Sequence, residues 1–87
     1  MCFGIGTLLL NAVKTIAEQE HCHRLWLVTT NDNIQALRFY QKRGFTLVAL
    51  HRNELERSRR LKPEIPLIGE NGIPLRDEIE LEMILTN

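Results

Sequence analysis

Gly4-Ile5-Gly6-Thr7 is the stretch that decides the fold, because an apolar helical pattern follows it directly. From Ile5 onwards, apolar residues recur at intervals of three and four, which is the period of one buried helix face. The members of this stripe are Ile5, Leu8, Leu9, Ala12, Val13, Ile16 and Ala17. The spacing predicts a helix over residues 5–20 that begins at a glycine-rich turn.

A glycine-rich turn at the start of a helix is chemically suited to an anion. The first backbone N–H groups of a helix have no partner within it, and the helix dipole adds positive potential at the same place. Gly4 and Gly6 lack Cβ, so a phosphate can approach the backbone, and Thr7 carries a hydroxyl donor. An ordinary helix start with flexible glycines is the alternative, because a short glycine motif on its own is a weak signal.

The composition describes a small chain of balanced charge. Its 87 residues allow at most one small domain. Eleven basic and eleven acidic residues give a formal net charge of zero, which argues against nucleic acid as a main partner. No apolar run approaches the ~20 residues of a membrane span, and the first residues lack the basic start of a secretory signal. We therefore expect a cytoplasmic protein whose Cys2 and Cys22 are free thiols.

The remaining sequence alternates strand and helix patterns. Residues 25–29 and 45–51 predict strands, and residues 34–43 predict a helix that stops at Gly44 after a basic last turn. A short helix within residues 52–62 and an irregular loop over residues 63–77, which holds all three prolines, follow. Residues 78–85 alternate glutamate with apolar side chains and give the clearest strand signal. The prediction is a mixed α/β fold with three strands and two main helices.

A second motif lies across the predicted helix of residues 34–43. The spacing Asn-x-x-Ala-x-x-Phe-Tyr-x-x-x-Gly-Phe is met by Asn33, Ala36, Phe39, Tyr40, Gly44 and Phe45. Together with the glycine loop, this motif resembles the C-terminal part of the GNAT superfamily of acyl-CoA N-acyltransferases. The loop of that family reads Gln/Arg-x-x-Gly-x-Gly/Ala; Met1 stands at the Gln/Arg position here, while Gly4 and Gly6 match. The resemblance covers essentially the whole chain, as one partial domain over residues 1–87.

The resemblance implies a cosubstrate, acetyl-CoA or CoA, with no metal, and a reaction that transfers an acetyl group to an amine. The backbone amides of Gly4, Ile5, Gly6, Thr7 and Leu8 would hold the CoA pyrophosphate. Asn33 would contact the pantetheine arm or a nearby backbone group, and Ala36 would leave room beside the cofactor. The resemblance also implies that the last strand is antiparallel to the other two and lies between or beside them.

The resemblance gives Tyr40 the catalytic role of protonating the departing thiolate. Ala36 and Tyr40 are four residues apart and so share one helix face, which lets a cofactor that passes Ala36 reach the Tyr40 hydroxyl. A phenol with a pKa of ~10 is protonated at pH 7 and has a proton to donate. The alternative for Tyr40 is plain core packing with Phe39.

The family fold places about four strands and two helices before the glycine loop, where they supply most of the acceptor pocket. We expect these segments to be absent here, so that the 87 residues alone show little acetyl transfer. Their absence would leave the edge of the strand at residues 25–29 bare, which predicts a homo-oligomer or a complementing chain. Two further interpretations stay open: a non-catalytic CoA-binding remnant, and a structural or dimerisation module.

Three polar clusters have a solvated surface as their simplest interpretation. His21-Cys22-His23 predicts a turn, because adjacent ligands cannot easily converge on one metal ion. Arg57, Arg59, Arg60 and Lys62 predict a solvated face, with the CoA 3′-phosphate or an acidic partner as the alternative. Glu78, Glu80 and Glu82 share one strand face and are expected to face solvent, although an acidic wall could also attract an amine.

Overall fold

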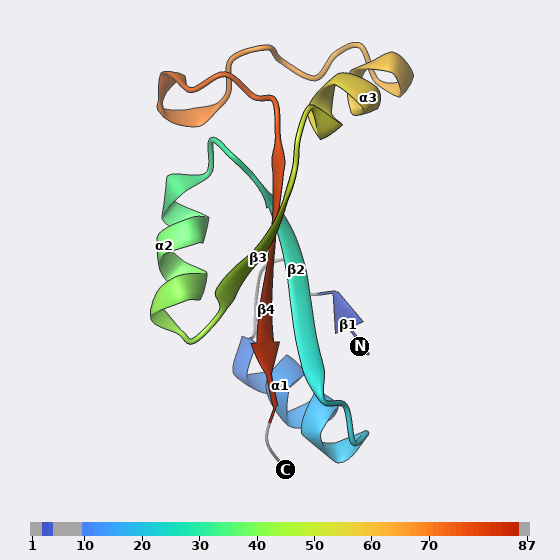
Figure 1. Ribbon diagram of the computed structural model, residues 1–87, viewed down its shortest axis with the longest axis vertical. Helices are drawn as coiled ribbons and strands as arrows, with labels where there is room; N and C mark the ends of the chain where they lie inside the picture. Colours follow the sequence, from blue (N-terminus) through green and yellow to red (C-terminus); the bar gives the residue numbers. More distant parts are fainter. Residues whose placement is uncertain (1–2, 5–9, 86–87) are drawn as a thin grey trace.

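The computed structural model describes residues 3–4 and 10–85 and confirms the predicted mixed α/β architecture (Figure 1). The elements in chain order are β1 (Phe3–Gly4), α1 (Leu10–Gln19), β2 (Arg24–Thr30), α2 (Ile34–Lys42), β3 (Thr46–His51), α3 (Glu54–Leu61), the 3₁₀ turn η1 (Glu70–Gly72) and β4 (Glu78–Ile84). The strands form one sheet in the order β1-β2-β4-β3. Each of the three long strands lies within one residue of its predicted bounds.

The last strand lies in the middle of the sheet. β4 is antiparallel to both β2 and β3, as predicted, and its Leu81 pairs with Leu27 on one side and Leu47 on the other. β1 adds a fourth, two-residue strand that runs parallel to β2 at Leu25 and Trp26. The expectation of a bare edge along residues 25–29 is therefore wrong at these two residues.

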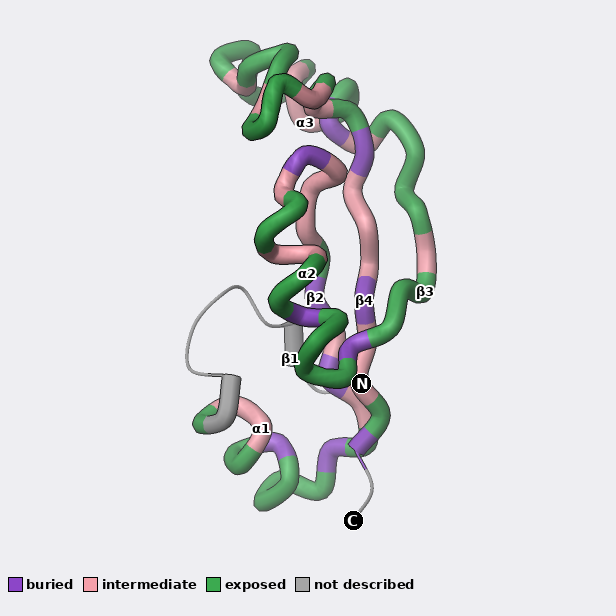
Figure 2. The backbone as a smooth tube through the Cα atoms, turned by 90° about the vertical axis from the view of Figure 1, so that its left-hand side faces the viewer, coloured by how far each residue is buried: buried purple, intermediate pink, exposed green. Residues whose placement is uncertain are grey.

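The core lies on one face of the sheet, beneath α2 (Figure 2). Alternation along the strands sends Leu25, Leu27 and Leu81 to this face, where they are buried. Tyr40 from α2 and Ala17 from α1 belong to the same buried cluster. The opposite face carries charged side chains of β2 and β4, because the same alternation places them there.

The ends of α2 show why this sequence forms a helix between two turns. Asn33 is the N-cap residue and binds a backbone N–H of the first turn. At the other end, Gly44 has a φ of 100°, a left-handed conformation that glycine adopts without strain. The N–H groups of Arg43 and Phe45 both donate to the carbonyl of Tyr40, which satisfies a carbonyl that the helix leaves free. The predicted helix over residues 34–43 is confirmed within one residue.

The predicted loop over residues 63–77 is held tightly against the sheet by Asn31. The Asn31 side chain donates to the carbonyl of Pro74 at 2.8 Å and accepts the N–H groups of Arg76 and Asp77 at 3.1 and 3.0 Å. The loop also contains η1 and a bridge between Ile68 and Pro74. Residues 63–77 are therefore held in one conformation by hydrogen bonds to the end of β2 and by contacts within the loop.

Cys22 is buried and disulfide-bonded, so the expectation of a free thiol is wrong for this residue. Cys2 lies outside the described residues. In the part of the chain that the structure describes, no helix has both the length and the apolar character needed to cross a membrane.

Candidate active site

The start of α2 is built around Asn33. Its Oδ1 accepts the backbone N–H of Ala36 at 3.1 Å, so the side chain satisfies one of the orphan donors of the first helical turn. Ala36 is half-buried and packs against the core cluster. The Asn33 side chain thus binds a backbone group of its own helix. Asn33 thus sets the position from which the rest of α2 projects.

Tyr40 lies one turn beyond Ala36, on the face of α2 that meets the sheet. Its ring is buried and makes edge contacts with Phe39 and Phe45, at centroid distances of 5.2 and 5.5 Å. Burial raises the pKa of Tyr40 above its ordinary value, because the phenolate would lose its hydration. The side chain therefore packs in the core and also keeps its proton at neutral pH.

The glycine loop is described only at its first residue. Gly4 ends β1 and lies beside Trp26 of β2, while Ile5, Gly6, Thr7 and Leu8 lie outside the described residues. β1 and β2 are parallel, so their carboxyl ends point towards the same end of the sheet. The chain leaves β1 after Gly4 and enters α2 after β2 through Asn33. Crevices at the carboxyl ends of parallel strands are the usual ligand sites of α/β sheets.

A buried carboxylate that belongs to neither sequence motif, Asp32, lies beside Asn33. Asp32 accepts the Thr30 hydroxyl at 2.5 Å and the N–H of Glu70 at 2.7 Å, and its carbonyl accepts the Asn71 side chain at 3.1 Å. Burial works to raise the pKa of Asp32, but the hydrogen bonds that its carboxylate accepts from the Thr30 hydroxyl and the Glu70 N–H help to outweigh burial, and the pKa is lowered. Asp32 is therefore a charged anchor that ties η1 to the start of α2.

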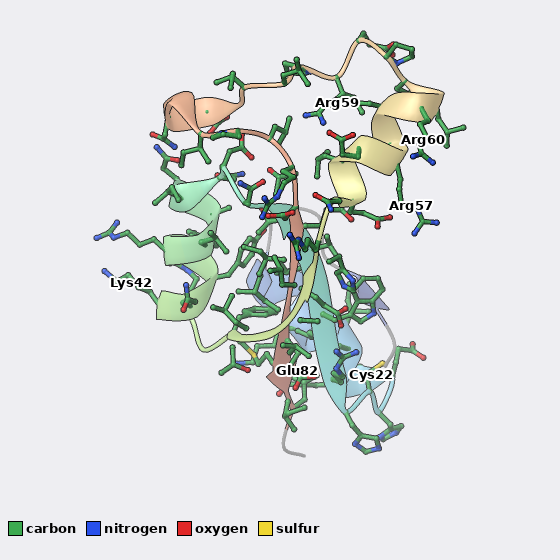
Figure 3. The ribbon with its side chains drawn as sticks, turned by 45° about the horizontal axis from the view of Figure 1, so that its top comes forward. Cys22, Lys42, Arg57, Arg59, Arg60 and Glu82 are labelled. Carbon is green, nitrogen blue, oxygen red and sulfur yellow. The ribbon has the colours of Figure 1, made fainter. Side chains whose placement is uncertain are left out.

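Arg59 is not part of a solvated cationic face, which corrects that expectation. Its side chain is only 14% exposed and donates to the carbonyls of Ile65 at 3.3 Å, Pro66 at 2.8 Å and Leu75. Figure 3 shows Arg59 on the side of α3 that faces the loop, whereas Arg57 points away from it. The guanidinium of Arg59 thus joins α3 to residues 63–77 through hydrogen bonds.

The glutamates of β4 form ion pairs across the open face of the sheet. Arg24 bonds Glu80 at 2.8 Å and also bonds Glu82, and His51 lies 3.1 Å from Glu80. Hydrogen bonds from Arg24 and then from His51 lower the pKa of Glu80. Glu78, Glu80 and Glu82 are all half-buried, so they are not the fully solvated row of three glutamates that the alternation predicts. A carboxylate paired in this way is a poor general base, since catalysis at neutral pH favours a raised pKa.

The His21-Cys22-His23 segment forms a turn at the end of α1, as predicted. His21 has a φ of 60°, both histidines are exposed, and Cys22 turns inward. Among residues 3–4 and 10–85, no three His, Cys, Asp or Glu side chains are grouped so as to hold a metal ion.

The parallel β1–β2 pair, the capped helix α2 and the antiparallel β2-β4-β3 sheet are those of an acyl-CoA acyltransferase fold. Residues 2–45, half of the chain, match the model of the acetyltransferase (GNAT) family. The chain belongs to this family.

Two Bacillus subtilis (strain 168) relatives are similar over most of the chain. The uncharacterized protein YdhI is 52% identical over 82 residues, which are 94% of this chain and 51% of YdhI. The uncharacterized protein YxbD is 50% identical over 78 residues, which are 90% of this chain and 49% of YxbD. The chain thus spans about half the length of the curated relatives it matches.

Solved structures of the same family share the fold. A GNAT acetyltransferase from Elizabethkingia anophelis with acetyl-CoA bound is 30% identical, with a TM-score of 0.73 over 87% of this chain and 46% of that chain. An IAA acetyltransferase from Bacillus cereus has the same identity and TM-score, over 87% of this chain and 47% of that chain. A Bacillus subtilis acetyltransferase in complex with CoA has 30% identity and a TM-score of 0.71, over 88% of this chain and 47% of that chain.

Proposed function

We propose that this chain forms the acyl-CoA-binding half of an N-acetyltransferase, which moves an acetyl group from acetyl-CoA to an amine. The observation that carries the proposal is the arrangement on α2: a capping Asn33, then Ala36, then a buried and protonated Tyr40. Similar structures that hold acetyl-CoA or CoA support the choice of cosubstrate. Residues 1–87 would act as a single partial domain.

In this proposal the backbone amides of residues 4–8 hold the CoA pyrophosphate at the start of the first helix. The pantetheine arm passes Asn33 and Ala36 and brings the thioester sulfur to Tyr40. The amine nitrogen bonds to the acetyl carbon, the tetrahedral intermediate collapses, and the carbon–sulfur bond breaks. Tyr40 gives its proton to the departing CoA sulfur, and the proton released by the amine restores the phenol. Such general acid help is worth ~10²–10⁴-fold in rate.

The proposal extends to the setting of the protein. Its zero net charge supports a protein with neither a nucleic acid nor a membrane as partner. We place it in the cytoplasm, a compartment in which a disulfide such as that of Cys22 is rare. We propose further that it works as a homo-oligomer or with a complementing chain that completes the acceptor site.

Two measurements on the 87-residue chain test the function. Calorimetric titration with acetyl-CoA should show binding, and Gly6→Asp should weaken it at least tenfold, because the added carboxylate repels the pyrophosphate. Thiol release with a panel of amines should be slow, and Tyr40→Phe should lower whatever release is observed by about 10² or more while acetyl-CoA binding persists.

The alternatives give different results in the same assays. Binding that Gly6→Asp abolishes, with no release for any amine, would identify a CoA-binding remnant. No binding by the folded wild-type chain would identify a structural module. If Tyr40→Phe leaves the rate of thiol release unchanged, Tyr40 is not the general acid of the reaction.

A further inference from the structure

We infer that Asn71 and Gly72 form a modification site, at which the Asn71 side chain is converted without an enzyme to an aspartate or an isoaspartate. The two residues lie at the tip of a short hairpin within residues 67–75. Asn71 has a φ of 61° and Gly72 a φ of 69°, and the N–H of Ile73 donates to the carbonyl of Glu70 at 3.2 Å. Two successive positive φ values are typical of a type I′ turn, for which Asn-Gly is a preferred sequence.

The hairpin presents this pair of residues at the surface. The bridge between Ile68 and Pro74 joins its two arms and leaves the turn at the end. Asn71 and Gly72 are both exposed, and a Cβ at Gly72 would meet no atom of the described residues within 4 Å. The pair is therefore open to water, and no side chain at position 72 hinders the backbone nitrogen.

The first step exchanges one amide for another. The backbone nitrogen of Gly72 bonds to the side-chain Cγ of Asn71, which closes a succinimide ring. The bond from Cγ to Nδ2 breaks, and Nδ2 leaves as ammonia together with the proton of the Gly72 N–H. Glycine favours this step because it has no Cβ beside the attacking nitrogen.

Water then opens the ring without any change in oxidation state. Its oxygen bonds to one of the two ring carbonyls, the bond from that carbon to the Gly72 nitrogen breaks, and this nitrogen regains a proton from the water. Attack at the side-chain carbonyl leaves an aspartate. Attack at the backbone carbonyl leaves an isoaspartate, in which the main chain runs through Cγ. Either product carries one more negative charge than asparagine at neutral pH.

The nitrogen that leaves is the one that binds the hairpin to the start of α2, beside which η1 lies (Figure 1). Asn71 Nδ2 donates to the carbonyl of Asp32 at 3.1 Å and to Oε1 of Gln35 at 3.5 Å. A carboxylate has only acceptors, so the products would face these two oxygens with a third oxygen. An isoaspartate also lengthens the turn that presents the Glu70 N–H to the Asp32 carboxylate. The modification therefore releases the hairpin from α2.

Mass spectrometry of the purified chain, incubated at neutral pH for days and digested with trypsin, tests the site. Residues 61–76 form one tryptic peptide, in which Asn71 is the only asparagine or glutamine. This peptide should gain the mass difference between an amide and a carboxylic acid and should appear as two products. The peptide of residues 25–38 is the internal control, because neither of its asparagines precedes a glycine, and it should keep its mass.

Gly72→Ala is the variant that separates the chemistry from the fold. It should slow the mass gain at least tenfold, because a Cβ then stands beside the attacking nitrogen. A positive φ is strained for alanine, so the variant also loosens the turn, which by itself would free the Asn71 amide and speed the reaction. Slowing therefore cannot come from misfolding. A wild-type peptide that keeps its mass, or an equal gain in Gly72→Ala, overturns the inference.

Hydrogen exchange tests the release of the hairpin, and no readout involves CoA. The extra negative charge allows the modified chain to be separated by ion exchange. Amides of residues 67–75 should exchange faster in the modified chain than in the unmodified chain, whereas amides of residues 24–30 should not change. Equal exchange of residues 67–75 in the two forms would show that the hairpin stays bound to α2, and would overturn its release.

Discussion

The contact between Asp32 and Gly69 decides how the loop meets the start of α2. A Cβ at Gly69 would lie 2.1 Å from Asp32 Oδ2, although the φ of −97° at this position suits any residue. Gly69→Ala should therefore lower the free energy of unfolding by about 1–3 kcal/mol, through overpacking alone. Urea denaturation measures this. In the Asp32→Ser background the same alanine should cost much less, and an equal cost in both backgrounds would contradict the contact.

Residues differ in how far sequence reasoning could place them. The cap at Asn33 follows from local chemistry, since an Asx residue before an apolar helical pattern binds the first turn. The anchoring role of Asp32 depends on Glu70 and Asn71, which lie far along the chain, and no local pattern reports such a contact. The motif predicts the position of Tyr40 on the helix. Its burial and its raised pKa depend on the packing of the core, which no local pattern reports.

At the scale of elements, Arg59 joins α3 to the loop. Arg59→Ala should lower the free energy of unfolding by about 1–3 kcal/mol, because carbonyls of the loop lose their donor. Arg57→Ala on the exposed side of α3 is the control and should change it by less than about 0.5 kcal/mol. If Arg59→Ala and Arg57→Ala change the free energy of unfolding equally, the hydrogen bonds of Arg59 to the loop do not stabilise the fold. Thermal or urea unfolding measures this.

Periodicity predicted the elements whose signal is local. The three long strands and α2 have runs long enough to show a period, and their bounds were predicted within a residue or two. β1 has two residues, too few for any period, and forms because β2 lies beside it. The prolines of residues 63–77 predict an irregular loop, and sequence could not show its order, because that order comes from contacts with Asn31, Asp32 and Arg59.

The stability of the whole molecule should fall in acid. Hydrogen bonds to Arg76 and to the Asn53 N–H lower the pKa of Asp77, and the pKa values of Asp32 and Glu80 are also lowered. Groups with a lowered folded pKa stabilise the fold above their unfolded values of ~4 and lose this contribution as the pH falls through the folded pKa. The urea midpoint should thus decrease from pH 5 to pH 3. Asp77→Asn should flatten this decrease, whereas a midpoint that rises in acid would contradict it.

The central position of β4 also determines when the protein can fold during its synthesis. β2 and β3 are not neighbours in the sheet, and each of these long strands pairs with β4, which follows both of them in the chain. Until residues 78–84 are available, β3 has no partner among the described strands and β2 has only the two-residue β1, and loop closure over this distance slows the non-local pairing. Before β4 joins the sheet, the chain therefore exposes apolar strand residues, which is the kind of state that is prone to aggregation.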